Sequence, residues 1–134
     1  MRAWIVTAAG AVVAMVLAVP VLLGLLQILT PSPESAVTLH MRNYYFYLGA
    51  DLAHPNPTLR FARGARVRFV LTNDEDTHVV HNFGIPALGV PCGKPMEPGE
   101  RREVTVVMPD STGSIAYTCC AHPGMGGQIV IADR

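Results

Sequence analysis

The pattern of hydrophobic and polar positions divides the chain into two parts. No charged residue occurs between Ala3 and Leu29, and most residues of this stretch are apolar. A helix of this length, at about 1.5 Å per residue, is longer than the roughly 30 Å hydrocarbon core of a bilayer. Beyond Ser35 the pattern changes to short runs in which apolar and polar residues alternate. We therefore expect a membrane-spanning segment followed by a domain of a different kind.

Residues 1–30 predict one transmembrane helix. Arg2 precedes the apolar run and Glu34 follows it, so the positive-inside rule places the N-terminus in the cytoplasm. The apolar run is longer than that of a typical cleaved signal peptide and no clear small-x-small site follows it, although a signal peptide is the alternative. Residues 31–36, with two prolines, then form a linker. Residues 37–134 form a domain on the periplasmic or extracellular side of the cytoplasmic membrane.

The exported domain is predicted to be all-β. Its short runs are rich in Val, Ile, Thr, Tyr and Phe, and turn signals separate them about every ten residues. In one of these runs Val67, Phe69 and Leu71 recur at every second position, as in a strand with one buried face. This spacing predicts a β-sandwich. The expected strands are residues 37–47, 58–61, 66–73, 78–83, 103–108, 114–119 and 128–132.

Charge and cysteine content narrow the function classes. The 134 residues carry 10 Lys and Arg and 10 Asp and Glu, without a basic cluster, so no nucleic acid is expected as a partner. The sequence contains neither a Gly-x-Ser-x-Gly motif nor a phosphate-binding loop, so no organic substrate is expected either. Three cysteines are an odd number, so at least one is free, metal-bound or paired with another chain. The count favours a metal site.

The segment 117–125, YTCCAHPGM, concentrates candidate metal ligands. A thiolate, two imidazoles and a weak thioether form the ligand set of copper electron-transfer sites, because soft sulfur stabilises Cu(I) while imidazole also accommodates Cu(II). Cys119, His122 and Met125 supply three of these groups from one loop. The second imidazole must come from elsewhere in the chain.

Strand alternation selects among the alternatives for two of the ligands. Cys119 and Cys120 point to opposite faces of an extended strand, and Cys119 is expected to face the interior. His81 and His78 also lie on opposite faces of their predicted strand. Because acidic residues precede His78, it is expected to face water. His81 is therefore the expected second imidazole and His78 the alternative.

Two further groups have an ordinary structural interpretation. The alternating aromatics of the run 44–47 are expected to fill the core on one side of a strand rather than to form an interaction surface. The acidic run 74–76 is expected to be a turn, and His40 and His54 are expected to be solvated. None of these residues is predicted to serve the metal site.

On these residues the domain resembles a cupredoxin. The segment 117–125 is similar to the ligand loop of the amicyanin and plastocyanin group, and the segment 81–86 is similar to the binuclear copper domain of cytochrome oxidase subunit II. The resemblance covers roughly residues 59–131 and implies a Greek-key β-sandwich with copper at one end. It also implies that Asn82 helps to hold the ligand loop. His122 would be the more exposed ligand and the exit for electrons.

The sequence departs from these families at its cysteines. The binuclear family has two bridging cysteines separated by three residues, whereas Cys119 and Cys120 are adjacent, which favours one copper ion. Cys92 and Cys120 are additional to the amicyanin pattern. A disulfide between them would leave Cys119 for the metal, while a free thiol or a further sulfur ligand at Cys92 are the alternatives.

The sequence therefore predicts a membrane-anchored mononuclear copper protein that transfers single electrons between redox partners and is not itself an enzyme. A respiratory or photosynthetic membrane complex is the expected class of partner. Two alternatives stay open. One is a carrier that delivers copper to an oxidase, for which the additional thiols would be useful. The other is a structural cupredoxin subunit of a membrane redox complex.

Overall fold

The structure is a computed structural model, and it describes residues 34–133. The predicted transmembrane helix or signal peptide, and residues 31–33 of the predicted linker, lie outside the described residues. Within residues 34–133 no helix combines the length and the hydropathy that crossing a membrane requires. This part of the chain contains seven strands and one short 3-10 helix, η1 (Pro86–Leu88).

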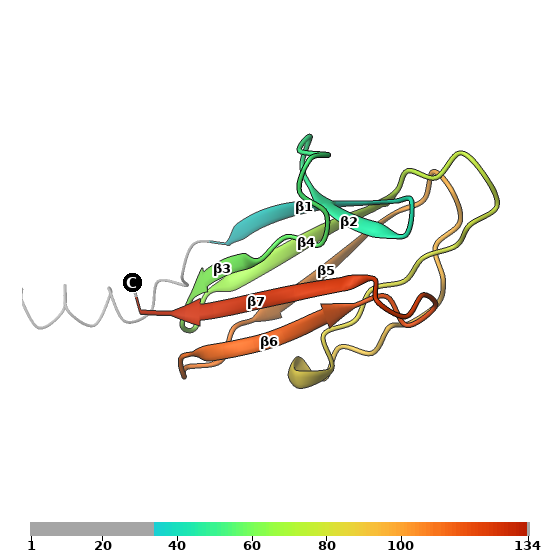
Figure 1. The fold of residues 1–134 in the computed structure, drawn as a ribbon. Coiled ribbons are helices and arrows are strands. Elements are labelled where there is room, and N and C mark those ends of the chain that lie inside the picture. The colour runs from blue at the N-terminus through green and yellow to red at the C-terminus, as the bar shows by residue number, and fades with distance from the viewer. Residues whose placement is uncertain (1–33, 134) are drawn as a thin grey trace, which may run out of the picture. The chain divides into compact units, whose positions relative to one another are not determined.

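The strands form two facing sheets (Figure 1). The first has the order β2-β1-β4-β5, and its strands are β1 (Ser35–Arg42), β2 (Tyr45–Leu48), β4 (Arg66–Asn73) and β5 (Arg101–Val107). The second has the order β3-β7-β6, with β3 (Leu59–Ala62), β7 (Gly126–Ala132) and β6 (Gly113–Thr118). Both sheets are mixed, since β1 pairs in parallel with β4 and β3 with β7. The all-β prediction is confirmed, and the arrangement is consistent with a cupredoxin-like sandwich.

The core lies between the sheets and follows the alternation of the strands. Val67, Phe69 and Leu71 of β4 are buried, as predicted. Phe46 and Tyr117, from opposite sheets, are also fully buried, and their ring centroids lie 5.2 Å apart in an edge-to-face contact. Such aromatic pairs contribute about 0.5–1.5 kcal/mol beyond the burial of their area. This packing fixes the end of the sandwich from which the β6–β7 loop emerges (Figure 1).

The predicted strand 37–47 is interrupted by a tight turn. Asn43 and Tyr44 form a two-residue hairpin loop between β1 and β2, with Arg42 paired to Tyr45. Both loop residues have positive φ, 51° and 65°, which is the geometry of a type I′ turn. Asn-Gly is the preferred pair for this turn, so a tyrosine at its second position conceals the turn in the sequence. A left-handed conformation costs a non-glycine residue about 1–2 kcal/mol.

The turn also changes the environment of the aromatic run. Phe46 and Tyr47 of β2 are buried in the core. Tyr44 and Tyr45 are 52% and 44% exposed, so the core takes two neighbouring residues of the run and not the alternate ones that were expected. The reason is that the turn falls within the run: Tyr44 lies in the turn, and Tyr45 directly follows it as the first residue of β2.

The predicted strand 78–83 does not form. His81 makes a single bridge with Met96, in which each backbone N–H donates to the carbonyl of the other residue. The side chain of the buried Asn73 donates to the carbonyls of Val79 and Met96, both at 2.9 Å. This side chain replaces part of a strand ladder, so the segment remains irregular. His81 is nevertheless buried and His78 exposed, as predicted.

Candidate metal centre

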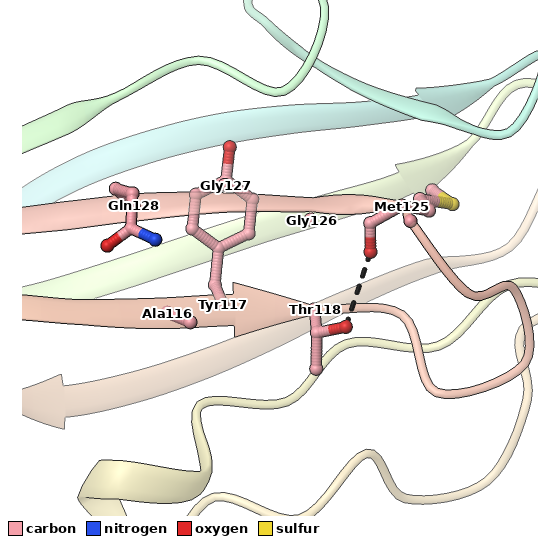
Figure 2. A pocket seen from close by; sticks show the side chains of 8 residues that line it. Ala116, Tyr117, Thr118, Met125, Gly126, Gly127 and Gln128 are labelled. Carbon is pink, nitrogen blue, oxygen red and sulfur yellow. Dashed lines mark hydrogen bonds between the residues drawn. The ribbon is translucent and has the colours of Figure 1, made fainter.

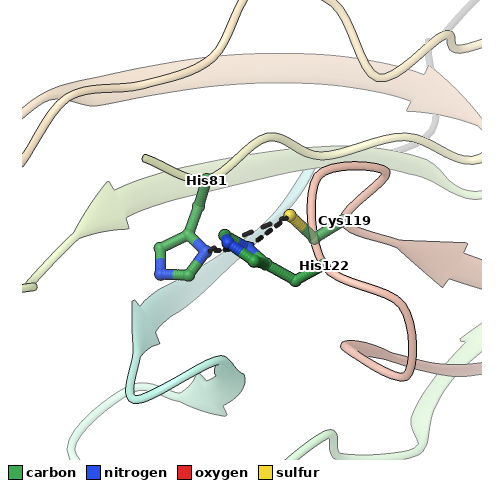
Figure 3. Close-up of side chains that lie close together, drawn as sticks. All are labelled: His81, Cys119 and His122. Atoms are coloured by element: carbon green, nitrogen blue, oxygen red, sulfur yellow. Dashed lines mark hydrogen bonds between the residues drawn. The ribbon is translucent and has the colours of Figure 1, made fainter. Parts of the chain in front are cut away.

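Two loops at one end of the sandwich bring three candidate ligands together. His81 lies in the connection between β4 and η1, whereas Cys119 and His122 lie in the loop between β6 and β7. The ligand atoms of these three residues lie within 4.8 Å of one another. Figure 3 shows both imidazoles turned toward the sulfur of Cys119. His78, the alternative second imidazole, is exposed and is not part of this group.

The separations between these atoms suit a single metal ion. Nδ1 of His81 lies 3.1 Å from Nδ1 of His122, and the Cys119 sulfur lies 4.0 and 3.6 Å from these two atoms. Zinc, an ion of similar size, binds imidazole nitrogen at about 2.0 Å and thiolate at about 2.3 Å, so ligands of one ion lie within about 4 Å (N to N) and about 4.3 Å (N to S). All three separations are within these limits. The donor set therefore fits one copper ion.

Glu75 sets the orientation of the His81 ring. Its carboxylate oxygen lies 2.8 Å from Nε2 of His81, and the two side chains are 8% and 0% exposed. A carboxylate only accepts hydrogen bonds, so Nε2 carries a proton; Nδ1 then donates to Cys119 when the ring is protonated, and offers its lone pair to a metal ion when the ring is neutral. The acidic run 74–76 was expected to be an ordinary turn, and its sequence gave no sign of this contact. Glu75 is brought inward because its own N–H donates to the side chain of the buried Asn73.

The thiol of Cys119 is set to ionise easily. Burial raises its pKa, but hydrogen bonds from His81, from the backbone N–H of Asn82 and from His122 together outweigh burial and lower the pKa to about 6. For His81, burial lowers the pKa, while hydrogen bonding with Cys119 and Glu75 raises it above its usual value. A thiolate beside these imidazoles is the form that binds a metal.

This ionisation can be tested in the metal-free protein. We expect the ultraviolet absorbance of the Cys119 thiolate to titrate with a midpoint near pH 6. A depressed folded-state pKa means that the unfolded chain binds more protons above that pH. The contribution of Cys119 to stability is therefore full above the unfolded pKa of about 9 and is lost as the pH falls through about 6. A midpoint at 8 or higher would contradict the arrangement of donors around the sulfur.

The β6–β7 loop is closed by its own backbone. The N–H of Cys119 donates to the carbonyl of Met125 at 2.9 Å, and the N–H of Met125 donates to the carbonyl of His122 at 3.1 Å. Gly124, with φ of 88°, makes the turn that these bonds require. The hydroxyl of Thr118 also donates to the Met125 carbonyl, as Figure 2 shows. The Met125 side chain is buried at the end of this loop, and its role as a fourth ligand stays a prediction.

Comparison with known structures identifies the fold. No protein-family model matches the sequence, and no curated protein matches it. Auracyanin B matches with 20% identity and a TM-score of 0.52, over 77% of this chain and 91% of that chain. The periplasmic domain of cytochrome oxidase subunit II from Bradyrhizobium japonicum matches with 16% identity and a TM-score of 0.52, over 74% and 84%. Copper nitrite reductase from Nitrosomonas europaea matches with 22% identity and a TM-score of 0.58, over 76% and 42%.

The chain has the cupredoxin fold. It spans less than half the length of the nitrite reductase chain that it matches. At these levels of identity the likeness concerns the fold alone. The chemistry of this cupredoxin domain therefore depends on its own side chains.

Asn82 ties the two halves of the site together in the cupredoxin domain. Its backbone N–H donates to the Cys119 sulfur at 3.4 Å, and its side-chain oxygen accepts from the N–H of Cys120 at 2.7 Å. A hydrogen bond to a thiolate sulfur helps to set the potential of a copper–thiolate site. Asn82 therefore holds the ligand loop, as the resemblance implied.

A disulfide also holds the ligand loop. Cys92 and Cys120 are joined, with their Cα atoms 6.0 Å apart, and Cys119 is the free, buried cysteine. This is one of the alternatives that the sequence left open, and it accounts for the odd number of cysteines. The disulfide anchors the residue that follows Cys119 to the loop after η1. The start of the ligand loop is thus fixed twice, by Asn82 from the segment that carries His81 and by Cys92 from the loop after η1.

A shallow hollow of about 270 Å³ lies beside the ligand loop, over β6 and β7 (Figure 2). It is lined by Gly126, Gly127, Tyr117 and other residues of these strands, and none of the three converging ligands belongs to it. The two glycines leave this space because they have no side chains. The ring of Tyr117 occupies part of it, and its hydroxyl donates to the carbonyl of Pro57 at 2.7 Å. The hollow is therefore a packing feature and not the metal site.

An aromatic side chain also contacts the two imidazoles. The ring of Tyr44 lies edge-to-face against His122, with centroids 4.8 Å apart, and 6.1 Å from the centroid of His81. A contact of this kind contributes about 0.5–1.5 kcal/mol, whereas the left-handed conformation of Tyr44 costs about 1–2 kcal/mol. The free energy gained from the ring contact is therefore similar to the free energy that the left-handed conformation of Tyr44 costs. No pattern in the sequence indicated that Tyr44 lies near the site.

Proposed function

We propose that the cupredoxin domain binds one copper ion through His81, Cys119, His122 and Met125, and that it transfers single electrons between redox partners. The observation that carries this proposal is the convergence of two imidazole nitrogens and one thiolate within 4.8 Å. Bound copper supplies one-electron chemistry, because it is stable as both Cu(I) and Cu(II) with these ligands.

The protein side chains hold the ligands in fixed positions. His81 is held at Nε2 by Glu75, and Cys119 by hydrogen bonds from the backbone and the imidazoles. His81 and Cys119 are 0% and 1% exposed, so little water reorganises around them when the charge of the site changes. Met125 would add a weak thioether ligand that tunes the potential. A rigid and dry site of this kind is suited to electron transfer rather than to binding a substrate.

The exposed side of the site gives the route for electrons. His122 is the least buried of the three converging ligands, and Pro123 and Gly124 next to it are exposed. We expect a partner to approach this edge. Gly84, in the loop that carries His81, is buried, and a Cβ added there would lie 2.9 Å from the sulfur of Cys92. The partner would therefore contact the β6–β7 loop and not Gly84.

Membrane attachment belongs to the same proposal. Residues 1–30 would anchor the domain on the periplasmic or extracellular face of the cytoplasmic membrane, as their hydropathy and flanking charges suggest. Anchoring raises the effective concentration near other membrane proteins, so weak and short-lived contacts suffice. A respiratory or photosynthetic membrane complex is the partner class that we propose. A structural subunit of such a complex would keep the fold without exchanging electrons.

The disulfide weakens the interpretation as a copper carrier. That interpretation used Cys92 and Cys120 as additional thiols for soft Cu(I). In the structure these two residues are paired with each other, so one thiol, Cys119, remains in the described part of the chain. A single buried thiolate with two imidazoles suits an ion that stays in place.

Copper loading of the full-length chain in detergent tests the proposal. We expect one equivalent of copper, an intense visible thiolate-to-copper charge-transfer band and a reversible one-electron wave in voltammetry. Tight Cu(I) binding without a stable Cu(II) form would instead support copper delivery. A chain that binds no copper, but copurifies with other membrane subunits, would support the structural role.

Glu75 provides a prediction about the potential. Two opposite unit charges across one imidazole ring, roughly 7 Å apart, attract by about 2 kcal/mol at an effective dielectric constant of 20. The carboxylate of Glu75 favours Cu(II) by this amount over Cu(I). We therefore expect Glu75→Gln to raise the reduction potential by several tens of millivolts. Gln keeps an oxygen that accepts the proton of His81 Nε2, so the visible band should remain.

Asp76 offers a matched control for the charge. Its side chain is 81% exposed and pairs with Arg42, so Asp76→Asn removes the same charge from the same loop without touching His81. Solvent screens charges at this position. We expect the potential of Asp76→Asn to stay near that of the parent protein. Equal shifts in both variants would mean that the buried charge of Glu75 beside His81 has no special effect on the potential.

A further inference from the structure

The hairpin between β1 and β2 departs from the residue preference of its own turn. Asn43 and Tyr44 both have positive φ, 51° and 65°, and glycine is favoured at the second position because it has no Cβ to clash. The Tyr44 side chain is 52% exposed, so burial in the core does not explain its presence. Residues held in such conformations concentrate at functional sites.

Both the ring and the backbone of Tyr44 face the metal centre. The ring stands nearly perpendicular to His122, with an interplanar angle of 80°, and to His81, with an angle of 84°. The backbone N–H of Tyr44 points to the carboxylate of Glu75 at 3.5 Å. One turn residue therefore touches both imidazoles and the acid that orients one of them.

The two imidazoles are not held equally well without this contact. His81 is fixed at both nitrogens, by Glu75 at Nε2 and by the site at Nδ1. The hydrogen bonds that the His122 ring makes with described residues all use Nδ1, the atom that faces Cys119 and His81. No second hydrogen bond from residues 34–133 fixes the plane of its ring. The edge-to-face contact with Tyr44 supplies the missing constraint.

We propose that Tyr44 is a positioning residue that covers the imidazole pair, fixes the ring of His122 and limits the access of water to it. The apolar surroundings of a metal site control solvent access and hence its potential. The presence of tyrosine in this turn is therefore explained by its contact with the imidazoles, because glycine would adopt the positive φ at a lower cost. This inference rests on the proposed function, because the benefit of a fixed His122 is to a metal ligand.

The test uses the full-length, metal-free chain, so that it does not depend on copper binding. Tyr44→Gly removes the ring and relieves the turn, whereas Tyr44→Phe keeps the ring. Tyr45→Ala is the matched control, because Tyr45 is the next residue, is exposed to a similar extent and contacts the ring of Tyr47 instead. The rate at which diethyl pyrocarbonate acylates His122 is followed by peptide mass spectrometry. Imidazole proton shifts in NMR spectra and the unfolding midpoint in urea complete the measurements.

We expect Tyr44→Gly to raise the acylation rate of His122 at least threefold and to shift its imidazole protons, while the unfolding midpoint stays the same or rises. Tyr44→Phe and Tyr45→Ala should acylate at the parent rate. If His122 in Tyr44→Gly reacts at the parent rate, the ring of Tyr44 does not shield His122 and the inference is wrong. If Tyr44→Gly lowers the unfolding midpoint, the tyrosine serves folding and the inference is wrong. Should these results hold in a chain that binds no copper, the proposed function would fail while Tyr44 would still cover the imidazoles.

Discussion

Replacing Cys119 with serine is expected to abolish the intense visible band of the copper-loaded protein and to weaken copper binding by orders of magnitude. The band requires a thiolate on the metal, and Cys119 is the free cysteine, with its sulfur 3.6 and 4.0 Å from the two imidazole nitrogens. A serine hydroxyl is a hard donor that stays protonated near neutral pH, so it does not replace the soft thiolate for Cu(I). Visible absorption and competition with a Cu(I) chelator measure the two effects.

The double variant Cys92→Ser/Cys120→Ser is the matched control for Cys119→Ser. It removes two sulfur atoms that lie close to the site but belong to the disulfide. The charge-transfer band should persist. The free energy of unfolding should fall by about 2–4 kcal/mol, because the bridge closes a loop with a sequence separation of 28 residues. Loss of the band in the double variant together with its survival in Cys119→Ser would overturn the assignment of the thiolate.

Gly127→Ala is expected to reduce the free energy of unfolding of the metal-free protein by about 3 kcal/mol, as overpacking of a rigid core does. An added Cβ would lie 2.6 Å from Cζ and 2.7 Å from Cε1 of Tyr117. The ring cannot move aside, because it is fully buried, contacts Phe46 and is fixed by the bond from its hydroxyl to Pro57. Alanine in a strand gains only about 0.5–1 kcal/mol over glycine from chain entropy. Urea unfolding measures the difference.

The same substitution made in a Tyr117→Leu variant shows whether the steric clash with Tyr117 causes the loss of stability. Tyr117→Leu keeps an apolar side chain but removes the outer ring atoms that the added methyl group would meet. In this background the Gly127→Ala change should be close to neutral, so the two substitutions should be strongly non-additive. An equal loss of stability in both backgrounds would show that Gly127 is needed for another reason.

Local patterns in the sequence predicted much of the fold. The alternation in β4 identified Val67, Phe69 and Leu71 as buried, because strand periodicity depends on neighbouring residues only. The prediction failed where a turn lacked a signal, as at Asn43–Tyr44. It also failed where side chains replaced a ladder, as in residues 78–83 next to Asn73. In both places contacts between distant segments determine the backbone conformation.

In the candidate site, too, the sequence predicted local features and missed contacts between distant segments. The spacing of Cys119, His122 and Met125 in one loop was visible in the sequence, since a short loop must keep its ligands close together. Glu75 was not visible, because an acidic run between two strands usually faces water. Only the side chain of Asn73 and the position of His81 bring its carboxylate into the interior.

The sequence by itself determined the types of ligand, the all-β class of the domain and which of two adjacent cysteines faces inward. These properties follow from residue chemistry and from the period of a strand, which are local. The tertiary structure decided the pairing of Cys92 with Cys120, the burial of Glu75 against His81 and the contact of Tyr44 with His122. Each of these joins segments far apart in the chain, and the packing of the two sheets brings those segments together.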